Sequence, residues 1–238
     1  MIVEVLYPEV CDLYGELGNI RYLQKSCSEI EVIETGLKDE PAFVTSVPDL
    51  IYMGSMTERS QLLVLERLRR HKERVAELVK EGARFLITGN ALEIFGKKIA
   101  DKDGTVIESL GIIDTVASRD MMKRFNSLYL GTFEGMKIVG YKSQFSYSAW
   151  ENGADVKPLF ITERGPGIDN EAGGEGVRIN NFMATYLIGP LLVLDPPFTK
   201  YLLKQCGVYD KLAFEREAMD AYETRVREFS EPDRGFYY

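Results

Sequence analysis

Apolar and polar positions repeat with two different periods along the first half of the chain. Short apolar runs, each followed by a turn or loop, predict β-strands at residues 1–7, 29–36, 49–54 and 84–88. Between them, residues 17–27 predict a short helix, and residues 57–81 repeat apolar side chains at helical spacing and predict one long amphipathic helix. Strands that alternate with helices indicate βαβ units and therefore a parallel sheet.

The second half of the chain changes to short β-type runs separated by glycines and charged turns. These runs predict strands at residues 105–109, 110–117, 127–133, 136–143 and 156–162. Residues 163–180 are rich in glycine, polar and acidic residues and predict a mobile loop or hairpin, and residues 182–198 predict a buried strand-turn-strand segment. Two helices, at residues 197–207 and 209–229, and a loosely held tail complete the expected chain.

No break in composition marks a linker, so the pattern predicts one domain. We assign residues 1–206 to this domain and expect residues 207–238, a C-terminal helix and tail, to pack on it. A length of 238 residues is enough for one α/β domain with a sizeable core.

Charge and cysteine content narrow the classes of function. The formal net charge of −8 argues against a nucleic-acid surface, which needs clustered lysine and arginine, and against binding to an anionic membrane. No apolar stretch approaches the roughly 18–20 residues of a membrane helix, and the N-terminus has no secretory signal pattern. Cys11, Cys27 and Cys206 are scattered and odd in number, which fits reduced thiols in a cytoplasmic protein better than disulfides or a zinc site. We therefore expect no metal and no organic cofactor.

The only histidine, His71, lies in a strongly basic part of the predicted helix at 57–81. Four basic residues flank it, and the apolar stripe of that helix lies elsewhere, so we expect His71 on a solvated helix face. A catalytic dyad that contains histidine would have to use this residue. A solvated helix face does not favour that role.

In an open α/β sheet, ligands bind beyond the carboxyl ends of the strands. Four segments qualify, at residues 8–19, 54–61, 88–91 and 184–190. The third has the form of a nucleophile elbow, a strand that turns sharply into a helix, although no Cys or Ser stands at its tip. Gly89 and Asn90 tolerate positive φ, and the backbone N–H groups of Asn90, Ala91 and Leu92 would lie at a helix N-terminus, where they could hold an anion. An ordinary strand-to-helix turn explains the same residues at least as well.

The other segments have weaker signals. Gly54 and Ser55 open a helix after a strand and could present backbone N–H groups to a ligand, but Thr57 and its neighbours also form a routine capping set, which we favour. The glycines in residues 13–19 suggest close backbone approach without a dinucleotide or P-loop pattern. Tyr186 precedes a turn fixed by proline.

Five motifs together carry a family resemblance. They are LYPEVCDLYGELGNIRYL, LIYMGSMTERSQ, LITGNALEIFG, DGTVIESLGIID and ATYLIGPLL, which span roughly residues 2–206. In order and spacing they resemble the class I glutamine amidotransferases of the GatD and CobB/CobQ-like (cobyric-acid-synthase-like) family. The resemblance implies a flavodoxin-like α/β fold, with a mostly parallel central sheet flanked by helices and extra short strands in the second half. It also implies a Cys nucleophile, a His base, and delivery of ammonia to a partner synthetase in cell-wall or cobalamin-like biosynthesis.

Both reactive positions of the family are replaced in this sequence. Counting back from Gly96, the nucleophile position falls on Gly89, and residues 90–93 (Asn, Ala, Leu and Glu93) replace the Gly-Gly-Tyr-Gln that follows it. The base position falls on Ile188, inside an otherwise intact Thr-Tyr-Leu-x-Gly-Pro motif. A thioester mechanism needs a thiolate and a proton acceptor, which glycine and isoleucine do not provide.

Further pocket positions also depart from the family. Ser143 and Gln144 stand where GatD-like proteins carry an Asn-His-Gly-Gly motif. Arg124 matches a basic residue that is a candidate for holding the glutamine carboxylate, although a surface arginine is an equal alternative. Rescue by Cys11 is disfavoured because no histidine accompanies it, and a Ser143–Lys142 pair is disfavoured because adjacent strand residues point to opposite faces.

The sequence therefore leaves three hypotheses. The first is a catalytically silent homologue, a pseudoenzyme, that acts as a binding or regulatory subunit of a Mur-ligase-like or other synthetase. The second is an amidotransferase or hydrolase with relocated residues, or one that works only with a partner. The third is a sensor of a small amino acid, such as glutamine or glutamate, or of an anion, in which an anion would lie at the helix N-termini after residues 54 and 89 with Arg124 as its counter-ion. The candidate ligand-binding residues are Gly54, Ser55, Asn90, Ala91, Glu93, Arg124, Ser143, Gln144 and Tyr186.

Overall fold

A six-stranded sheet forms the centre of the molecule, in the order β13-β14-β4-β3-β1-β2. The computed structural model describes residues 1–151, 157–169 and 173–237. Within the sheet, all neighbouring strands are parallel except β13, which pairs antiparallel with β14 at one edge. The strands are β1 (Ile2–Leu6), β2 (Glu31–Thr35), β3 (Leu50–Met53), β4 (Phe85–Thr88), β13 (Val177–Ile179) and β14 (Phe182–Thr185). This is the mostly parallel sheet that the sequence predicts.

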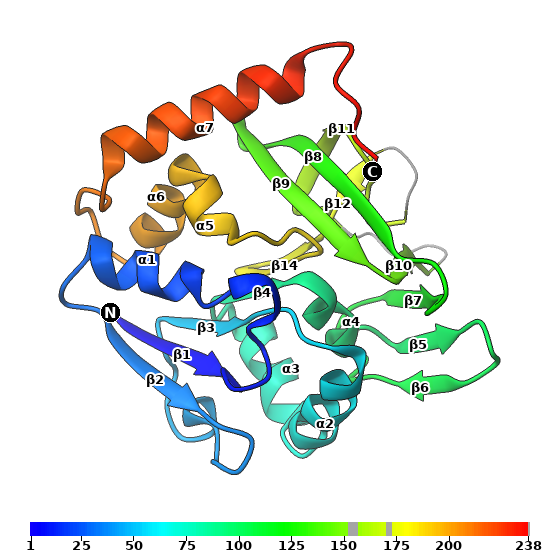
Figure 1. Cartoon of the computed structure of the whole chain (residues 1–238). Coiled ribbons are helices and arrows are strands. Elements are labelled where there is room, and N and C mark those ends of the chain that lie inside the picture. Colours follow the sequence, from blue (N-terminus) through cyan, green and yellow to red (C-terminus); the bar gives the residue numbers. More distant parts are fainter. Residues whose placement is uncertain (152–156, 170–172, 238) are drawn as a thin grey trace.

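Helices cover both faces of this sheet because its apolar side chains alternate along each strand (Figure 1). Ile51, Phe85 and Ile87 face α2 (Glu58–Arg69) and α3 (Lys72–Glu81). Val3, Val5, Leu50, Leu86 and Met183 face the opposite way, toward the core shared with the remaining helices. Those helices are α1 (Gly18–Ser26), α5 (Leu191–Leu194) and α6 (Pro196–Gln205).

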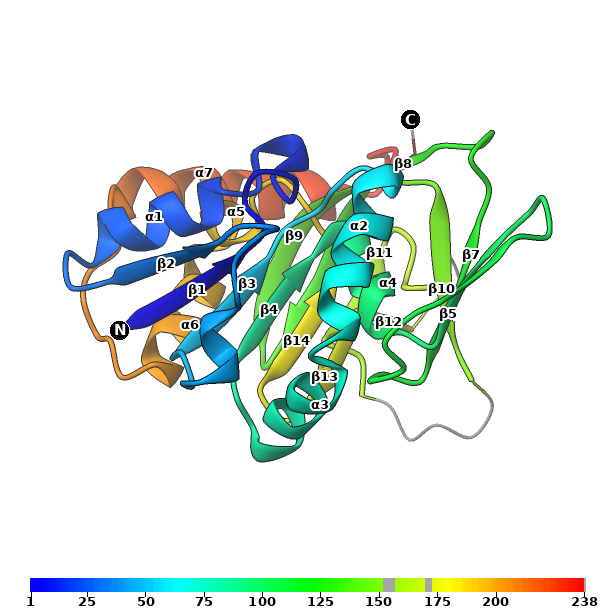
Figure 2. The same ribbon diagram turned by 90° about the horizontal axis from the view of Figure 1, so that it is seen from below.

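The second half of the chain builds two four-stranded sheets. One has the order β10-β7-β5-β6 and lies at the end of the molecule remote from β2 (Figure 2). Its strands are β5 (Lys98–Asp101), β6 (Val106–Glu108), β7 (Thr115–Arg119) and β10 (Ser146–Trp150). The other has the order β12-β11-β8-β9, with β8 (Phe125–Phe133), β9 (Met136–Gln144), β11 (Phe160–Arg164) and β12 (Gly174–Glu175). The short turns of helix are η1 (Leu13–Gly15), η2 (Ala42–Val44), η3 (Gly89–Ala91) and α4 (Leu92–Phe95).

The last helix, α7 (Glu215–Ser230), lies across β8 and β9 (Figure 1). Tyr222 and Phe229 on the helix pack with Leu128 and Val139 of those strands. Phe236 joins the same apolar cluster and is 6% exposed, and Tyr237 forms a β-bridge with Ser127. The expectation of a loosely held tail is therefore wrong for residues 236 and 237, because an aromatic side chain fixes them to the core.

The single helix expected at residues 57–81 is two helices, which break at Arg70 and His71. The apolar stripe skips the turn at 71 and 72, so no buried side chain holds the chain in a straight helix there. The ring of His71 packs edge-on against Phe43, with 5.9 Å between centroids, and its side chain is 15% exposed. His71 therefore lies at a helix start and not on a solvated face.

The segment 182–198 is also different from the expected strand-turn-strand. β14 ends at Thr185, and the apolar run after Pro190 forms the helical turn α5. Asn19 of α1 stabilises this turn, because its Oδ1 atom accepts a hydrogen bond from the Leu192 backbone at 2.7 Å. A four-residue apolar run fits a strand or a helix equally well, and tertiary contacts decide between them. Within the described ranges, no helix has the length and apolar character needed to cross a membrane.

Candidate functional site

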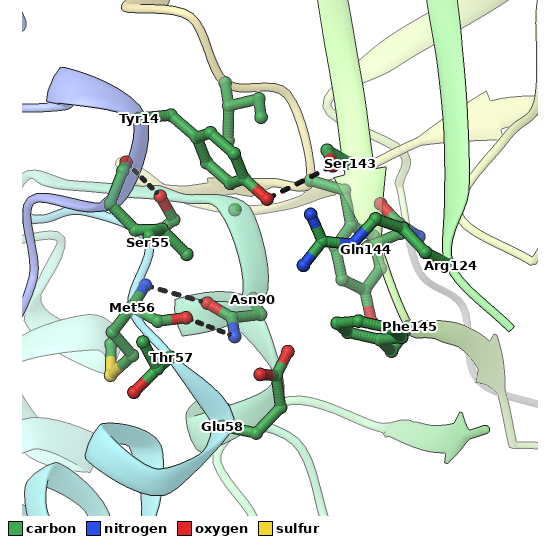
Figure 3. Close-up of a pocket in the computed structure, with 14 residues that line it drawn as sticks. Tyr14, Ser55, Met56, Thr57, Glu58, Asn90, Arg124, Ser143, Gln144 and Phe145 are labelled. Atoms are coloured by element: carbon green, nitrogen blue, oxygen red, sulfur yellow. Dashed lines mark hydrogen bonds between the residues drawn. The ribbon is translucent and has the colours of Figure 1, made fainter. Parts of the chain in front are cut away.

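A cavity of about 190 Å³ lies beyond the carboxyl ends of β3, β4 and β14, where the parallel sheet positions a site. Figure 3 shows its walls, which come from the elbow, the start of α2, the loop after β1 and the end of β9. The candidate residues that line it are Ser55, Gly89, Asn90, Arg124, Ser143, Gln144, Tyr186 and Ile188. Segments more than a hundred residues apart in sequence thus meet at the predicted edge.

The elbow retains the backbone of a nucleophile turn without its nucleophile. Gly89 directly follows β4 and has a φ of 62°, a left-handed conformation that favours glycine. A Cβ atom added at Gly89 would meet the Cβ atom of Ser55 closer than two non-bonded carbons can approach, and would lie 3.2 Å from Cγ2 of Ile188. Neighbouring side chains therefore occupy the space that a nucleophile would need.

The nucleophile and base positions still face each other. Ile188 is 5% exposed, and its backbone N–H donates to the carbonyl oxygen of Tyr141 at 3.0 Å, which ties this segment to β9. Its aliphatic side chain forms part of the cavity wall beside Gly89. The two positions of a catalytic dyad are therefore still adjacent, but neither carries a side chain that can attack a substrate or accept a proton.

Polar groups at the start of α2 are occupied by contacts within the protein. The side chain of Asn90 exchanges two hydrogen bonds with the Met56 backbone, at 3.0 and 2.8 Å (Figure 3). Thr57 accepts from the Ser60 backbone and caps α2, which confirms the capping interpretation. Ser55 donates to the carbonyl oxygen of Leu13 at 2.8 Å. These contacts close the turn and do not leave the Met56 N–H for an anion.

The opposite wall supplies the charged groups. The Arg124 guanidinium lies 4.6 Å above the ring of Phe145, and it forms no hydrogen bond or ion pair with the described residues. Glu58, which is partly exposed, points its carboxylate into the same space (Figure 3). Gln144 is 5% exposed, its Nε2 atom donates to the carbonyl oxygen of Ser146, and its buried Oε1 atom has no hydrogen-bond partner among the described residues. A cation and an anion therefore face one small volume.

Tyr14 covers this cavity from the loop after β1. Its hydroxyl donates to Ser143 at 3.1 Å, and Ser143 donates to Asn126 at 2.8 Å. Tyr14 also has a positive φ of 66°, which is uncommon for a side chain of this size. The sequence drew attention to this loop only through its glycines.

Three of the candidate residues do not line the cavity. Gly54 is buried with its Cα against the Cys11 backbone and Glu16, and Ala91 lies in the apolar core. Glu93 is 1% exposed and belongs to a polar layer behind the cavity, where it accepts hydrogen bonds from Gln61 at 3.0 Å and from Tyr186 at 3.1 Å. Burial raises the pKa of Glu93, against the lowering effect of these hydrogen bonds. Residues 91–95 are all buried, so Ala91 and Glu93 contact the core and the layer behind the cavity, and their part in ligand binding stays a prediction.

Sequence reasoning missed two buried groups that support the site. Glu16 accepts hydrogen bonds from the Thr88 hydroxyl and from the Gly189 backbone at 2.9 Å, so it joins the residue before the nucleophile position to the residue after the base position. Burial raises the pKa of Glu16 to about 7. The second group is the ion pair between Lys142 and Glu175, in which both side chains are fully buried.

The alternative nucleophile and base are not at this site. Cys11 is 1% exposed and packs against Met56 with 3.9 Å between sulfur atoms, and burial raises the pKa of its thiol. His71 lies beside Phe43 and does not line the cavity. Lys142 and Ser143 point to opposite faces of β9, as the strand period predicts, since one is buried and the other lines the cavity. Among the residues with described positions, no three His, Cys, Asp or Glu side chains gather as they would around a metal ion.

Comparisons with known proteins agree with this geometry. The model of the CobB/CobQ-like glutamine amidotransferase domain matches residues 2–193. The GatD subunit of lipid II isoglutaminyl synthase (glutamine-hydrolyzing) from Staphylococcus aureus is 25% identical over 211 residues, which cover 88% of this chain and 85% of that protein. Its counterpart from Streptococcus pneumoniae is 25% identical over 198 residues, covering 79% and 73%.

The fold is found in solved structures as well. A crystal structure of a glutamine amidotransferase superimposes with a TM-score of 0.55 at 16% identity, covering 87% of this chain and all of that one. At this identity the match concerns the fold alone. From the sheet, the elbow and the match over residues 2–193, the chain belongs to the CobB/CobQ-like glutamine amidotransferase domain family.

Proposed function

We propose that this protein is a non-catalytic member of its family, which serves as a binding or regulatory subunit of a partner ligase or synthetase in the cytoplasm. The observation that carries the proposal is the occupied space at Gly89, where the Ser55 side chain and Ile188 stand in place of a nucleophile and a base. Loss of either member of a catalytic unit removes nearly all of its rate, and the second loss adds little.

The kind of partner that we expect is inferred from the two related GatD proteins. The two GatD proteins are subunits of an enzyme that makes lipid II isoglutamine, and by analogy we expect a Mur-ligase-like protein or another synthetase as the partner. Analogy at the level of family does not fix the partner's identity. A candidate ligase encoded beside this protein is therefore the first to test by co-expression and affinity purification.

Ammonia release from glutamine is the decisive measurement. We expect none from the purified protein and none from its complex with the ligase, while the complex itself survives gel filtration. Glutamine hydrolysis at rates like those of active relatives, or a glutamyl adduct found by mass spectrometry, would refute the proposal and favour relocated catalytic residues. A ligase that does not associate would remove the partner assignment and leave the loss of catalysis standing.

A second candidate function rests on the charged groups of the cavity. Arg124 offers a cation to a carboxylate, and Glu58 offers an anion to an ammonium group. A cavity of about 190 Å³ admits a small amino acid. A thermal-shift screen with glutamine, glutamate and inorganic phosphate tests this sensor function. We expect glutamate or glutamine to raise the melting temperature of the wild type and not that of Arg124→Ala, and no shift with any of them would leave the sensor function unsupported.

A further inference from the structure

A second cavity, of about 490 Å³, lies on the outer sheet formed by β10, β7 and β5. Phe145 lines both this cavity and the first one, so its ring is part of their common wall. A volume of this size falls within the usual range of small-molecule sites, about 300–1,000 Å³. Neither the family motifs nor the candidate residues of the elbow fall here.

The floor of the second cavity is a row of three paired residues. Ala100 on β5 pairs with Ser118 on β7, which pairs in turn with Tyr147 on β10. Residues paired across strands share a face of the sheet, so the two small side chains leave an open shelf beside the Tyr147 ring. A planar group can lie on such a shelf.

Aromatic rings form the walls above this shelf. The rings of Phe125 and Tyr147 lie 5.1 Å apart at an angle of 55°, and Phe145 closes the side next to the first cavity. Aromatic faces favour offset or tilted contact with other planar rings. Three rings around one cavity therefore favour an aromatic ligand over an aliphatic one.

The charges of the second cavity favour an anion. Arg119 is held by Asp101 at 2.7 Å, and Lys102 is held by Asp120 at 2.8 Å. Lys123 is exposed and forms no hydrogen bond or ion pair through its side chain with the described residues. Arg119, whose side chain is 3% exposed, also donates to Gln61 in the interior, so Lys123 is the cation of the lining that is exposed and unpaired within the described residues.

We propose that the second cavity binds a planar aromatic ring that carries an anionic group, the chemistry of a nucleoside monophosphate. The ring lies on the shelf of Ala100 and Ser118 against Tyr147 and Phe125, and the anionic group meets Lys123 at the rim. The position is distinct from the elbow, so the proposal does not depend on the function proposed for the first cavity.

Calorimetric titration of the full chain tests this with AMP, adenosine and inorganic phosphate as three separate probes. We expect AMP to bind, adenosine to bind more weakly, and phosphate to bind least. Tyr147→Ala should weaken AMP binding by about tenfold or more, because a base stacked on an aromatic side chain contributes on that scale. Lys123→Ala should weaken AMP binding and leave adenosine unchanged.

Two controls separate this site from its surroundings. Val106→Ala changes an exposed residue of β6 that does not line the cavity, so AMP affinity should not change. Arg124→Ala removes a residue that lines the first cavity and not the second, but its guanidinium lies over the shared Phe145 ring, so this variant should weaken AMP binding less than Tyr147→Ala does. A larger loss of AMP affinity in Arg124→Ala than in Tyr147→Ala would overturn the proposal. Absence of AMP binding at millimolar concentration, or phosphate binding as tight as that of AMP, would overturn it equally.

Discussion

The reactive face of the first cavity and the polar layer behind it differ in how completely their polar groups are paired. At the face, Gly89 and Ile188 bring no polar side chain, and the Arg124 guanidinium forms no hydrogen bond or ion pair with the described residues. Behind it, Lys142 donates to Glu175 and to the carbonyl oxygens of Pro166 and Gly167 at 3.0 and 2.9 Å. The buried Lys142 and Glu175 side chains are paired because a buried charge without partners would destabilise the fold, whereas the fold does not depend on the catalytic side chains.

Breaking the buried ion pair should have the largest effect on stability. Lys142→Met keeps the length of the side chain and leaves the Glu175 carboxylate buried without its cation. Loss of one member of a buried pair costs about 3–5 kcal/mol of unfolding free energy. Urea denaturation followed by circular dichroism measures the change.

Lys97→Met is the matched control, because Lys97 pairs with Asp114 and Glu151 at the surface and is 39% exposed. Exposed pairs contribute little, so this variant should change stability far less. Equal losses in the two variants would show that the buried layer is no more important than a surface pair.

The second effect is a dependence of stability on pH through Glu16. The pKa of this group is about 7 in the folded protein against 4.5 when it is unperturbed, so the native state binds its proton more tightly than the unfolded state does. Stability from this group is therefore full below about pH 4.5 and is lost as the pH rises to 7, by about 3 kcal/mol at most.

The side chain of glutamine does not titrate, so in Glu16→Gln the free energy of unfolding should fall less between pH 4.5 and pH 7 than it does in the wild type. The measurement is the difference in unfolding free energy between pH 5 and pH 8, taken for both proteins, since other buried carboxyls contribute equally to each. Parallel pH profiles for the wild type and the variant would show that Glu16 titrates normally.

A third prediction concerns the attempt to restore catalysis. Gly89→Cys combined with Ile188→His supplies both family residues, yet the new Cβ meets Ser55 and the backbone stays at positive φ. We expect no ammonia release and a loss of about 1–3 kcal/mol of stability from overpacking in Gly89→Cys. Adding Ser55→Gly should recover part of that loss in a double-mutant cycle. Glutamine hydrolysis by the two-residue variant would show that only the side chains, and not the space, were lost.

Sequence patterns predicted most of the fold because the first half repeats strand and helix periods clearly. The predictions of one helix at residues 57–81 and of a strand-turn-strand at residues 182–198 are wrong for the same reason. The apolar pattern does not show which side chains form tertiary contacts. His71 and the run after Pro190 are both decided by contacts, with Phe43 and with Asn19 respectively. These contacts join residues far apart in the sequence, so local periodicity cannot predict them.

The candidate site divides in the same way. Motif spacing identified Gly89 and Ile188, which the fold brings side by side from positions 99 residues apart. Lys142 and Glu175 lie outside the family motifs, and Glu16 lies inside the first motif without a recognisable role there, so the importance of all three follows from burial together with long-range pairing. A charged residue within an apolar strand, as Lys142 is in β9, indicates a buried partner but does not identify it as Glu175.

The smallest expected effect tests how the face of the cavity is closed. Tyr14→Phe removes the hydroxyl that donates to Ser143 and leaves Ser143 free to keep its bond to Asn126, so it should cost at most about 1 kcal/mol. Ser143→Ala removes both contacts and leaves the Asn126 acceptor unpaired, so urea denaturation should show a larger loss. If Tyr14→Phe cost as much as Ser143→Ala, the tyrosine hydroxyl would be a structural element of the buried layer and not a cover over an open cavity.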